Sequence, residues 1–303
     1  MARILLSAMG TAVAPSIIKS IQAEGHFVIG MDAGEHPTGQ FFADDFWRAP
    51  LIKNKQGYIN FLVEKSNQFD VFFPYIDEEL VLLSERWGHL PDVLKDKIFI
   101  SCAEAIQITD DKIEFHKFCK ENDIPCVELA TTFPAYYKPR SGRGGNGHSV
   151  ITTQDEWDYF SKKTEGMFQE NIRGMEYTID VLTGKNGEWI FGLPRKRLSA
   201  KGVSTVGQID VRQDILDLCK KCVEALDFKG PINIQIFECD KTGRLLLSEI
   251  NPRLSGSYLF CAQAGFNVAA ESIALFLNDE YPKDRDIADQ KIIWRFYEEF
   301  IPA

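Results

Sequence analysis

The sequence contains no apolar stretch long enough to span a lipid bilayer, no low-complexity tract and no internal repeat. Its first residues hold an apolar run much shorter than the core of a signal peptide. Basic residues are outnumbered, since 34 Lys and Arg stand against 44 Asp and Glu, for a formal net charge of -10. A general nucleic-acid-binding protein needs an extended basic surface, so that class is not expected. We therefore expect a cytoplasmic protein with neither membrane nor nucleic acid as a partner.

Cysteine and histidine are too few and too scattered to form a recognisable framework. The seven cysteines are an odd number, which suits a reducing compartment. Cys219 and Cys222 form a CxxC pair, but they recur with Ile215 and Leu226 at helical spacing, and no second pair lies nearby. We interpret both sulfurs as part of a core, not as a zinc or redox site. The sequence also lacks GxSxG, HExxH and Ser-His-Asp arrangements, which disfavours a hydrolase.

The first third of the chain alternates between strand and helix patterns. An amphipathic helix is expected over residues 14–25, and buried strands at 3–8, 26–32, 69–75 and 97–101. This alternation is typical of an open parallel sheet. The 303 residues suffice for two domains, so we predict an α/β N-terminal domain over residues 1–108.

The first strand–helix turn has too little glycine for a dinucleotide site. Gly10 is its only glycine, whereas the dinucleotide fingerprint needs three for the tight turn and the close approach of the pyrophosphate. Asp32, which would bind the ribose of such a cofactor, is therefore interpreted as a turn residue.

After Thr109 the pattern becomes that of an α+β unit. A helix is expected over residues 109–125, with Thr109 or Asp110 accepting hydrogen bonds from the first-turn amides and Pro125 ending it. Strands and hairpins are then expected at 133–139, 149–153, 167–172, 175–194 and 231–252, and helices at 212–228 and 267–278.

The last hairpin gathers polar side chains on one face. Because side chains of a strand alternate between its faces, Glu249, Asn251 and Arg253 share one face. Asn233 and Gln235 on the neighbouring strand can face them. One carboxylate and several amide oxygens suit magnesium, which binds hard oxygen ligands and leaves room for substrate phosphates. A polar network that joins two strands is the alternative, and spacing alone leaves both open.

A glycine-rich loop over residues 138–149 is a second candidate site. Glycine lets a backbone turn and bring its amides close to an anion. It is not a Walker loop, because no Gly-Lys-Ser/Thr follows, and a hairpin that merely reverses the chain is the alternative. Its glycines and cations are Gly142, Gly144, Gly145 and Gly147 with Lys138, Arg140 and Arg143.

Two further segments carry weaker signals. Glu176 follows Glu170 across a turn at Gly174, so a carboxylate and extended backbone groups could together hold a ribose and an adenine. Residues 195–207 are predicted to form a basic loop, which would suit a phosphate or a carboxylate; a solvated loop is the alternative. Its cations are Arg195, Lys196, Arg197 and Lys201.

The order of these segments resembles the ATP-grasp superfamily, and most closely the nucleotide-binding half-units of the carbamoyl-phosphate synthase large subunit. The resemblance covers residues 109 to 278, and the preceding sheet resembles the N-terminal, pre-ATP-grasp domain of the family. It implies an ATP-grasp domain over 109–303 with a small lid subdomain at about 127–182.

Three departures accompany the resemblance. The chain between Pro125 and Lys138 is shorter than usual for the family, and Gln235 stands where many members have Asp. The 303 residues also hold a single such unit, so a complete carbamoyl-phosphate synthase is not expected of this polypeptide alone.

The resemblance implies a group of residues that bind ATP. Two lysines would reach the phosphates, two glycines would close over them, a short segment would contact adenine through its backbone, and a carboxylate would hold the ribose. In that order these are Lys112 and Lys138, Gly144 and Gly145, Glu170, Asn171 and Ile172, and Glu176.

It also implies metal ligands and catalytic residues. Gln235, Glu249 and Asn251 match the ligands of magnesium, with Glu249 bridging two ions, for which Mn²⁺ can substitute. Arg253 matches the arginine aimed at the reacting phosphate and carboxylate, with Arg197 as its partner.

The activity implied is that of an ATP- and magnesium-dependent carboxylate–amine ligase. Members of the superfamily transfer the γ-phosphoryl group to a small-molecule carboxylate, and an amine then displaces phosphate from the acyl phosphate. The alternatives are phosphorylation of bicarbonate or carbamate with a partner subunit, and a nucleotide-binding module without turnover. The resemblance further implies a homodimer and an acceptor pocket built from the N-terminal sheet and the loop after Arg253, with Ser255, Ser257 and Tyr258.

Overall fold

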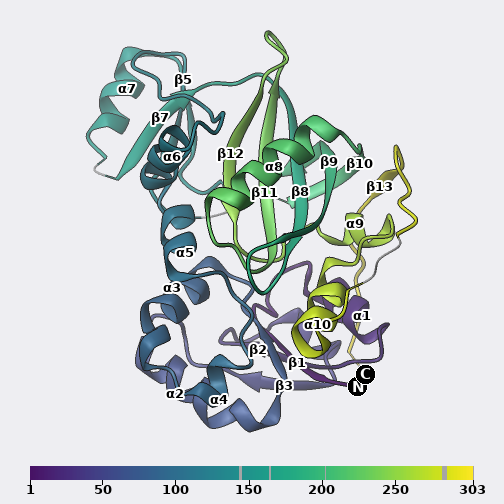
Figure 1. Ribbon diagram of the computed structural model, residues 1–303. Helices are drawn as coiled ribbons and strands as arrows, with labels where there is room; N and C mark the ends of the chain where they lie inside the picture. Colours follow the sequence, from purple (N-terminus) through teal and green to yellow (C-terminus); the bar gives the residue numbers. More distant parts are fainter. Residues whose placement is uncertain (143–144, 164, 202, 282–284, 303) are drawn as a thin grey trace.

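Three β-sheets organise the chain in the computed structural model, which describes residues 1–142, 145–163, 165–201, 203–281 and 285–302. A four-stranded parallel sheet comes first, followed by a three-stranded sheet and a six-stranded antiparallel sheet (Figure 1). Within the described ranges, no helix has both the length and the apolar character needed to cross a membrane.

The first sheet has the strand order β3-β2-β1-β4 and confirms the predicted parallel arrangement. One face is covered by α1 and the later helix α10, and the other by α2 and α3, because successive strand residues point to opposite faces. The bounds are β1 (Arg3–Leu6), α1 (Ala14–Gln22), β2 (Phe27–Asp32), β3 (Asp45–Arg48), α2 (Lys55–Lys65), β4 (Val71–Phe73), α3 (Asp77–Arg86) and α4 (Asp92–Lys95).

Two expectations for this region had different outcomes. Asp32 is the last residue of β2, and its carboxylate stabilises the neighbouring turns by accepting hydrogen bonds from the Gly10 and Gly34 amides, each at 2.7 Å. The strand predicted at 97–101 is wrong: Ile98 makes one isolated bridge to Phe72, and the apolar side chains that suggested a strand are buried in the cores instead. The fourth strand is β3, which was not predicted.

The helix predicted over 109–125 is two helices with a break between them. They are α5 (Ala103–Asp110) and α6 (Lys112–Glu121). Thr109 and Asp110 therefore lie in the last turn of α5, where the Thr109 hydroxyl donates to the Ala105 carbonyl at 2.7 Å. The cap of α6 is Asp111, which accepts from the amides of Ile113 and Glu114 at 3.0 and 3.3 Å. The helix ends at Glu121, before Pro125.

The three-stranded sheet confirms the strands predicted around the glycine-rich loop. Its order is β6-β5-β7, and it has a small core of its own around Ala135, Tyr137 and Ile151. The elements are β5 (Ala135–Pro139), β6 (Ser149–Ile151), α7 (Gln154–Ser161) and β7 (Gly166–Glu170).

The six-stranded sheet, in the order β12-β11-β8-β9-β10-β13, contains both predicted hairpins. The basic loop predicted at 195–207 is wrong, because β9 continues as a strand to Lys201 and returns as β10. Arginines at alternate positions thus sit on a strand face and not in a solvated loop. The bounds are β8 (Gly174–Thr183), β9 (Trp189–Lys201), β10 (Val203–Ile209), α8 (Gln213–Ala225), β11 (Gly230–Cys239), β12 (Leu245–Asn251) and β13 (Ile292–Trp294).

Helix α8 lies across one face of this sheet (Figure 1), and that face is apolar. Cys219 and Cys222 are buried there and free, which confirms their interpretation as core residues.

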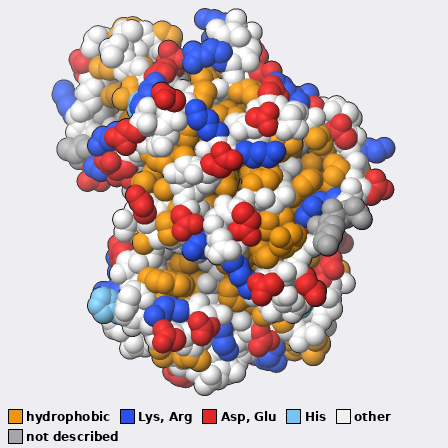
Figure 2. Space-filling model, in the orientation of Figure 1, with side chains coloured by type: hydrophobic (Ala, Val, Ile, Leu, Met, Phe, Trp, Pro, Cys, Tyr) orange, Lys and Arg blue, Asp and Glu red, His pale blue; other side chains and the backbone are white. Residues whose placement is uncertain are grey.

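On the outer surface seen in Figure 2, acidic and basic side chains are interspersed without one continuous area of either sign. The face of the six-stranded sheet that points away from α8 carries the polar residues considered below.

The chain ends by returning to the first sheet. Helices α9 (Leu259–Gln263) and α10 (Val268–Asn278) join the core that covers β1 and α1. Residues from the two ends of the sequence thus share one core, and the domain limits given above remain a prediction.

Candidate functional site

Residues of the three-stranded and six-stranded sheets, together with segments that follow strands of the first sheet, line one cleft of about 820 Å³. Every residue that the sequence singled out for ATP, metal or catalysis lines it, except Gly144, which lies outside the described residues. The members are Lys112, Lys138, Gly145, Glu170, Asn171, Ile172, Glu176, Arg197, Gln235, Glu249, Asn251 and Arg253.

The proposed metal ligands face one another across two neighbouring strands. Gln235 pairs with Glu249, and Asn233 with Asn251, so the predicted shared face of the hairpin is confirmed. One oxygen of Glu249 accepts from Gln235 Nε2 at 2.7 Å and from Asn251 Nδ2 at 3.0 Å. Among the described residues no group of three or more His, Cys, Asp or Glu gathers as a metal site. One carboxylate with two amide oxygens nevertheless fits magnesium that shares its coordination with phosphates.

Arg253 is held by a residue of the N-terminal part of the chain. Its Nε and Nη2 donate to the two carboxylate oxygens of Asp77, at 2.6 and 2.9 Å, and Nη2 also donates to Asn251 Oδ1 at 3.1 Å. Burial opposes the charged guanidinium, but the Asp77 carboxylate prevails and raises the pKa of Arg253. Asp77 begins α3, and its carboxylate joins the first sheet to the proposed catalytic arginine.

Sequence reasoning missed Asp77, although a signal was present. The residue lies two positions after the strand predicted at 69–75 of a parallel sheet. Ligands of such sheets bind beyond the carboxyl ends of the strands, so acidic residues at that position are candidates for a site.

A buried carboxyl group fixes the turn that carries Asp77. Glu79 accepts from the hydroxyls of Ser7 and Tyr58, each at 2.5 Å, and from the Tyr75 amide at 3.0 Å. Burial raises the pKa of Glu79, and the donated hydrogen bonds only partly oppose this. Ser7, Tyr58 and Glu79 thus hold the Tyr75 backbone, just before Asp77, in place.

Arg197 connects the proposed ribose carboxylate with the proposed metal ligands. Its guanidinium forms an ion pair with Glu176 and donates to Gln235 Oε1 at 3.4 Å. Burial raises the pKa of Glu176, while the charge of Arg197 opposes that rise. The register places Arg197 on β9 beside Glu176 on β8, on the cleft face of the sheet.

The two lysines reach the cleft from different elements. Lys138 on β5 is buried and donates to the Ser248 hydroxyl at 3.1 Å. Burial lowers the pKa of Lys138, and the nearby Glu249 carboxylate opposes this. Lys112, the first residue of α6, donates to the Gly142 carbonyl at 3.0 Å and so holds one end of the glycine-rich loop.

The glycine-rich loop uses the conformational freedom of its glycines. Gly142 and Gly145 have φ of +117° and +74°, which side chains other than glycine rarely adopt. Arg140 is not among the residues lining the cleft, because it pairs with the α6 cap Asp111 at 2.7 Å. Arg143 lies outside the described residues.

Arg195 is buried, although it was predicted to suit an anionic ligand. It is fully buried, pairs with Asp180, and donates to the hydroxyls of Ser255 and Ser257 at 3.2 and 2.7 Å. Tyr75 donates to the Ser255 carbonyl at 3.1 Å. The loop after Arg253 is therefore held from the sheet below and from the N-terminal part of the chain.

Two other residues singled out from the sequence do not contribute side chains to the described site. Lys196 is on β9 and pairs with Asp210 at 3.0 Å, while Tyr258 is completely buried in a core and does not line the cleft. The side chain of Lys201 lies outside the described residues.

Comparison with known proteins shows which proteins this chain resembles. The sequence model of the family described as "ATP-grasp in the biosynthetic pathway with Ter operon" matches residues 162–295. The carbamoyl phosphate synthase large chain of Clostridium perfringens is 26% identical over 140 residues, which are 41% of this chain and 13% of that protein. The N5-carboxyaminoimidazole synthetase of Staphylococcus aureus, solved with ADP, superposes with a TM-score of 0.75 at 18% identity, over 97% of this chain and 82% of that one. The chain has the ATP-grasp fold.

The fold is thus as predicted, an α/β parallel-sheet domain followed by an α+β ATP-grasp domain with a small lid. The L-amino acid ligase of Bacillus licheniformis also superposes, with a TM-score of 0.71 at 13% identity, over 92% of this chain and 74% of that one. At such low sequence identities the superpositions show the fold alone. The curated relative is far longer than this chain, which spans only 13% of it.

Proposed function

We propose that this ATP-grasp protein is an ATP- and magnesium-dependent carboxylate–amine ligase that acts through an acyl phosphate. The observation that carries the proposal is the face of β11 and β12, where the Glu249 carboxylate is held by two amides beside Arg253, in the same cleft as Lys112 and Lys138. These are groups that bind phosphates and a metal together, and a polar network between two strands would not need the two lysines.

The chain's own residues would bind and orient ATP. Lys112 and Lys138 would neutralise its phosphates, and Glu176 would accept hydrogen bonds from the ribose. The backbone of residues 170–172 would contact adenine, and Gly144 and Gly145 would close over the phosphates. Magnesium, when bound, would neutralise the charge that develops on the transferred phosphoryl group. Glu249, Gln235 and Asn251 would hold it; a second ion and substitution by Mn²⁺ are part of the proposal.

Two steps follow. The carboxylate oxygen of the acceptor attacks the γ-phosphorus, its bond to ADP breaks, and an acyl phosphate forms. The amine nitrogen then attacks the acyl carbon, inorganic phosphate leaves, and the nitrogen loses a proton to give the amide. Arg253 would orient the carboxylate in the first step, and Arg253 with Arg197 would donate to the oxyanion of the second.

The test is phosphate release from Mg-ATP with pairs of amino acids, taken as carboxylate and amine. Release that requires both members of a pair supports the ligase. Release with bicarbonate and ammonia alone would favour the alternative suggested by the carbamoyl phosphate synthase match. Tight ATP binding without turnover under every condition would favour a non-catalytic module. The predicted homodimer, which rests on the resemblance, and the predicted cytoplasmic location, which rests on the composition of the sequence, belong to the same proposal.

A further inference from the structure

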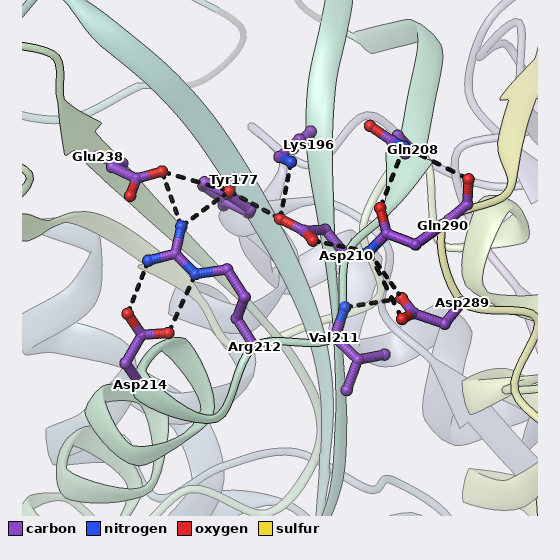
Figure 3. Close-up of polar contacts among 10 residues, drawn as sticks. All are labelled: Tyr177, Lys196, Gln208, Asp210, Val211, Arg212, Asp214, Glu238, Asp289 and Gln290. Carbon is purple, nitrogen blue, oxygen red and sulfur yellow. Dashed lines mark hydrogen bonds and ion pairs between the residues drawn. The ribbon is translucent and has the colours of Figure 1, made fainter.

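The last part of the chain, residues 289–302, forms a segment that we call the C-terminal strap. A polar network fixes its start to the six-stranded sheet (Figure 3). Gln290 Nε2 donates to Asp210 Oδ1 at 2.9 Å, and the Val211 amide donates to Asp289 at 3.0 Å. Asp210 in turn accepts from the Tyr177 hydroxyl at 2.9 Å. The strap therefore leaves the sheet from a defined position.

The strap then binds the loop that follows Arg253. Strand β13 pairs with β10, and the Arg295 amide donates to the Thr205 carbonyl at 2.8 Å. The Arg295 guanidinium donates to the Gly256 carbonyl at 2.9 Å and lies 5.3 Å from the centre of the Phe260 ring. Gly256 lies between the two serines held by Arg195, so strap and sheet hold the same loop.

Beyond Arg295 the strap crosses to the N-terminal part of the chain. Phe300 makes edge-to-face contacts with Phe41 and Phe42, at ring-centre distances of 5.8 and 5.0 Å. Tyr297 lies between these two attachments in the sequence and lines the cleft, yet its exposed fraction is 66%. An aromatic ring held at a cleft wall and still open to water is suited to cover part of a bound molecule.

Six other residues that line the same cleft indicate which groups of a bound molecule it suits. The first strand–helix turn and β9 contribute small, largely apolar side chains, and the loop after Arg253 contributes a glycine and hydroxyl groups. These lining residues are Thr11, Ala12, Val13, Ala200, Gly256 and Ser257. Apart from the ion pair of Asp77 and Arg253, this part of the lining suits uncharged groups.

We infer that Tyr297, carried by the strap between Arg295 and Phe300, forms part of the wall at the acceptor end of the cleft and is a specificity-determining residue for the carboxylate substrate. The inference rests on the proposed ligase function. With its carboxylate directed at Arg253, the acceptor places an apolar or aromatic side chain against the Tyr297 ring. Carboxylates without a side chain gain nothing from this contact.

The experiment compares wild type with Tyr297→Ala, Tyr297→Phe and Phe300→Ala, using phosphate release with glycine, alanine, leucine and phenylalanine as acceptors. Phe296→Ala is the matched control, because Phe296 is the strap's neighbouring exposed aromatic residue and is not among those lining the cleft. We expect Tyr297→Ala to raise the KM for leucine and phenylalanine about tenfold, with the KM for Mg-ATP and for glycine within about twofold of wild type. Tyr297→Phe should stay near wild type, and Phe300→Ala should change KM in the same direction as Tyr297→Ala.

Circular dichroism and the thermal unfolding midpoint show whether each variant is folded. An unchanged KM for every acceptor in folded Tyr297→Ala, or an equal rise in Phe296→Ala, would overturn the inference and leave the ligase proposal intact. Absence of turnover by the wild type with every carboxylate and amine would overturn the ligase proposal itself, and the inference with it.

Discussion

The two faces of the six-stranded sheet differ sharply although the same strands supply both. Toward α8 the strands present Tyr177, Ile179, Ile234 and Ile236, all fully buried. Toward the cleft they present charged and amide side chains, among them Glu176, Arg197, Gln235 and Glu249. Because side chains alternate with a period of two, neighbouring residues serve stability and chemistry separately.

One ion pair shows that the face alone does not decide a residue's role. Asp180 and Arg195 lie on the cleft side of the sheet, yet both are buried beneath the loop that contains Ser255 and Ser257. The pair formed by Arg253 and Asp77, in contrast, has side-chain exposures of 14% and 21% and lines the cleft. An arginine open to the cleft can meet a substrate, whereas a buried one can only position the residues around it.

The largest expected effect is a loss of kcat after a substitution on the cleft face of the six-stranded sheet. Glu249→Ala should lower kcat about a thousandfold, because it removes the only carboxylate of the proposed metal ligand set. The free energy of unfolding should change by less than about 1 kcal/mol, since the site is not part of the apolar core. Steady-state kinetics and urea unfolding measure the two quantities. Glu249→Gln, which keeps the shape of the side chain and loses its charge, should show a similar fall in kcat. Turnover near that of wild type in either variant would contradict a role for Glu249 as a metal ligand.

A substitution on the apolar face, toward α8, should lower stability and leave kcat nearly unchanged. Ile234→Ala should lower the free energy of unfolding by about 3 kcal/mol, because it leaves a cavity in the core beneath α8. The kcat of the folded protein should remain within about twofold of wild type. Leu277→Ala, at a partly exposed position, is the control and should cost much less stability. A large fall in kcat for folded Ile234→Ala would mean that the two faces are not independent.

Asp77→Asn tests whether the arginine pair at the cleft, unlike the buried pair, affects catalysis. We expect kcat to fall about 10- to 100-fold, because Arg253 loses a charged partner that fixes its direction. The KM for Mg-ATP should change little. Asp77→Glu should restore part of the loss, and Glu78→Gln on the same helix turn is the control. Equal losses in Asp77→Glu and Asp77→Asn would contradict a positioning role for this carboxylate.

The smallest expected effect is a change in the free energy of unfolding with pH. Burial raises the pKa of Glu79 above that of the unfolded chain, so the folded state binds this proton more tightly. Its contribution to stability is therefore complete below the unfolded pKa and is lost as pH rises through the folded pKa. Urea unfolding at a series of pH values from about 4 upward should show this slope in wild type and not in Glu79→Gln. Parallel curves for the two proteins would show that Glu79 has an ordinary pKa.

Much of the site could be predicted from the sequence, because its parts depend on local patterns. The alternation of Glu249 and Asn251 on one strand implied a shared face, and the register with Gln235 and Asn233 bears this out. Arg253, which was expected on the same strand, lies two residues beyond its end. Charge alone was a poorer guide at residues 195–207, where a basic segment forms two strands instead of a loop. The strand expected at 97–101 failed for a related reason, since an apolar run does not reveal whether its backbone joins a sheet.

The contacts that join distant segments could not be predicted. Asp77 and Arg253 are 176 residues apart in sequence, and no local pattern pairs them. Tyr297 reaches the cleft only because Arg295 and Phe300 attach the strap at two separate places. Such contacts depend on how the three sheets pack together.

The most direct test of the account follows an oxygen atom. A carboxylate acceptor that supports turnover is labelled with ¹⁸O in its carboxylate, and the inorganic phosphate released from Mg-ATP is examined by mass spectrometry. An acyl phosphate intermediate predicts that each released phosphate carries one oxygen atom from the carboxylate. Phosphate whose new oxygen comes from water alone would contradict the account.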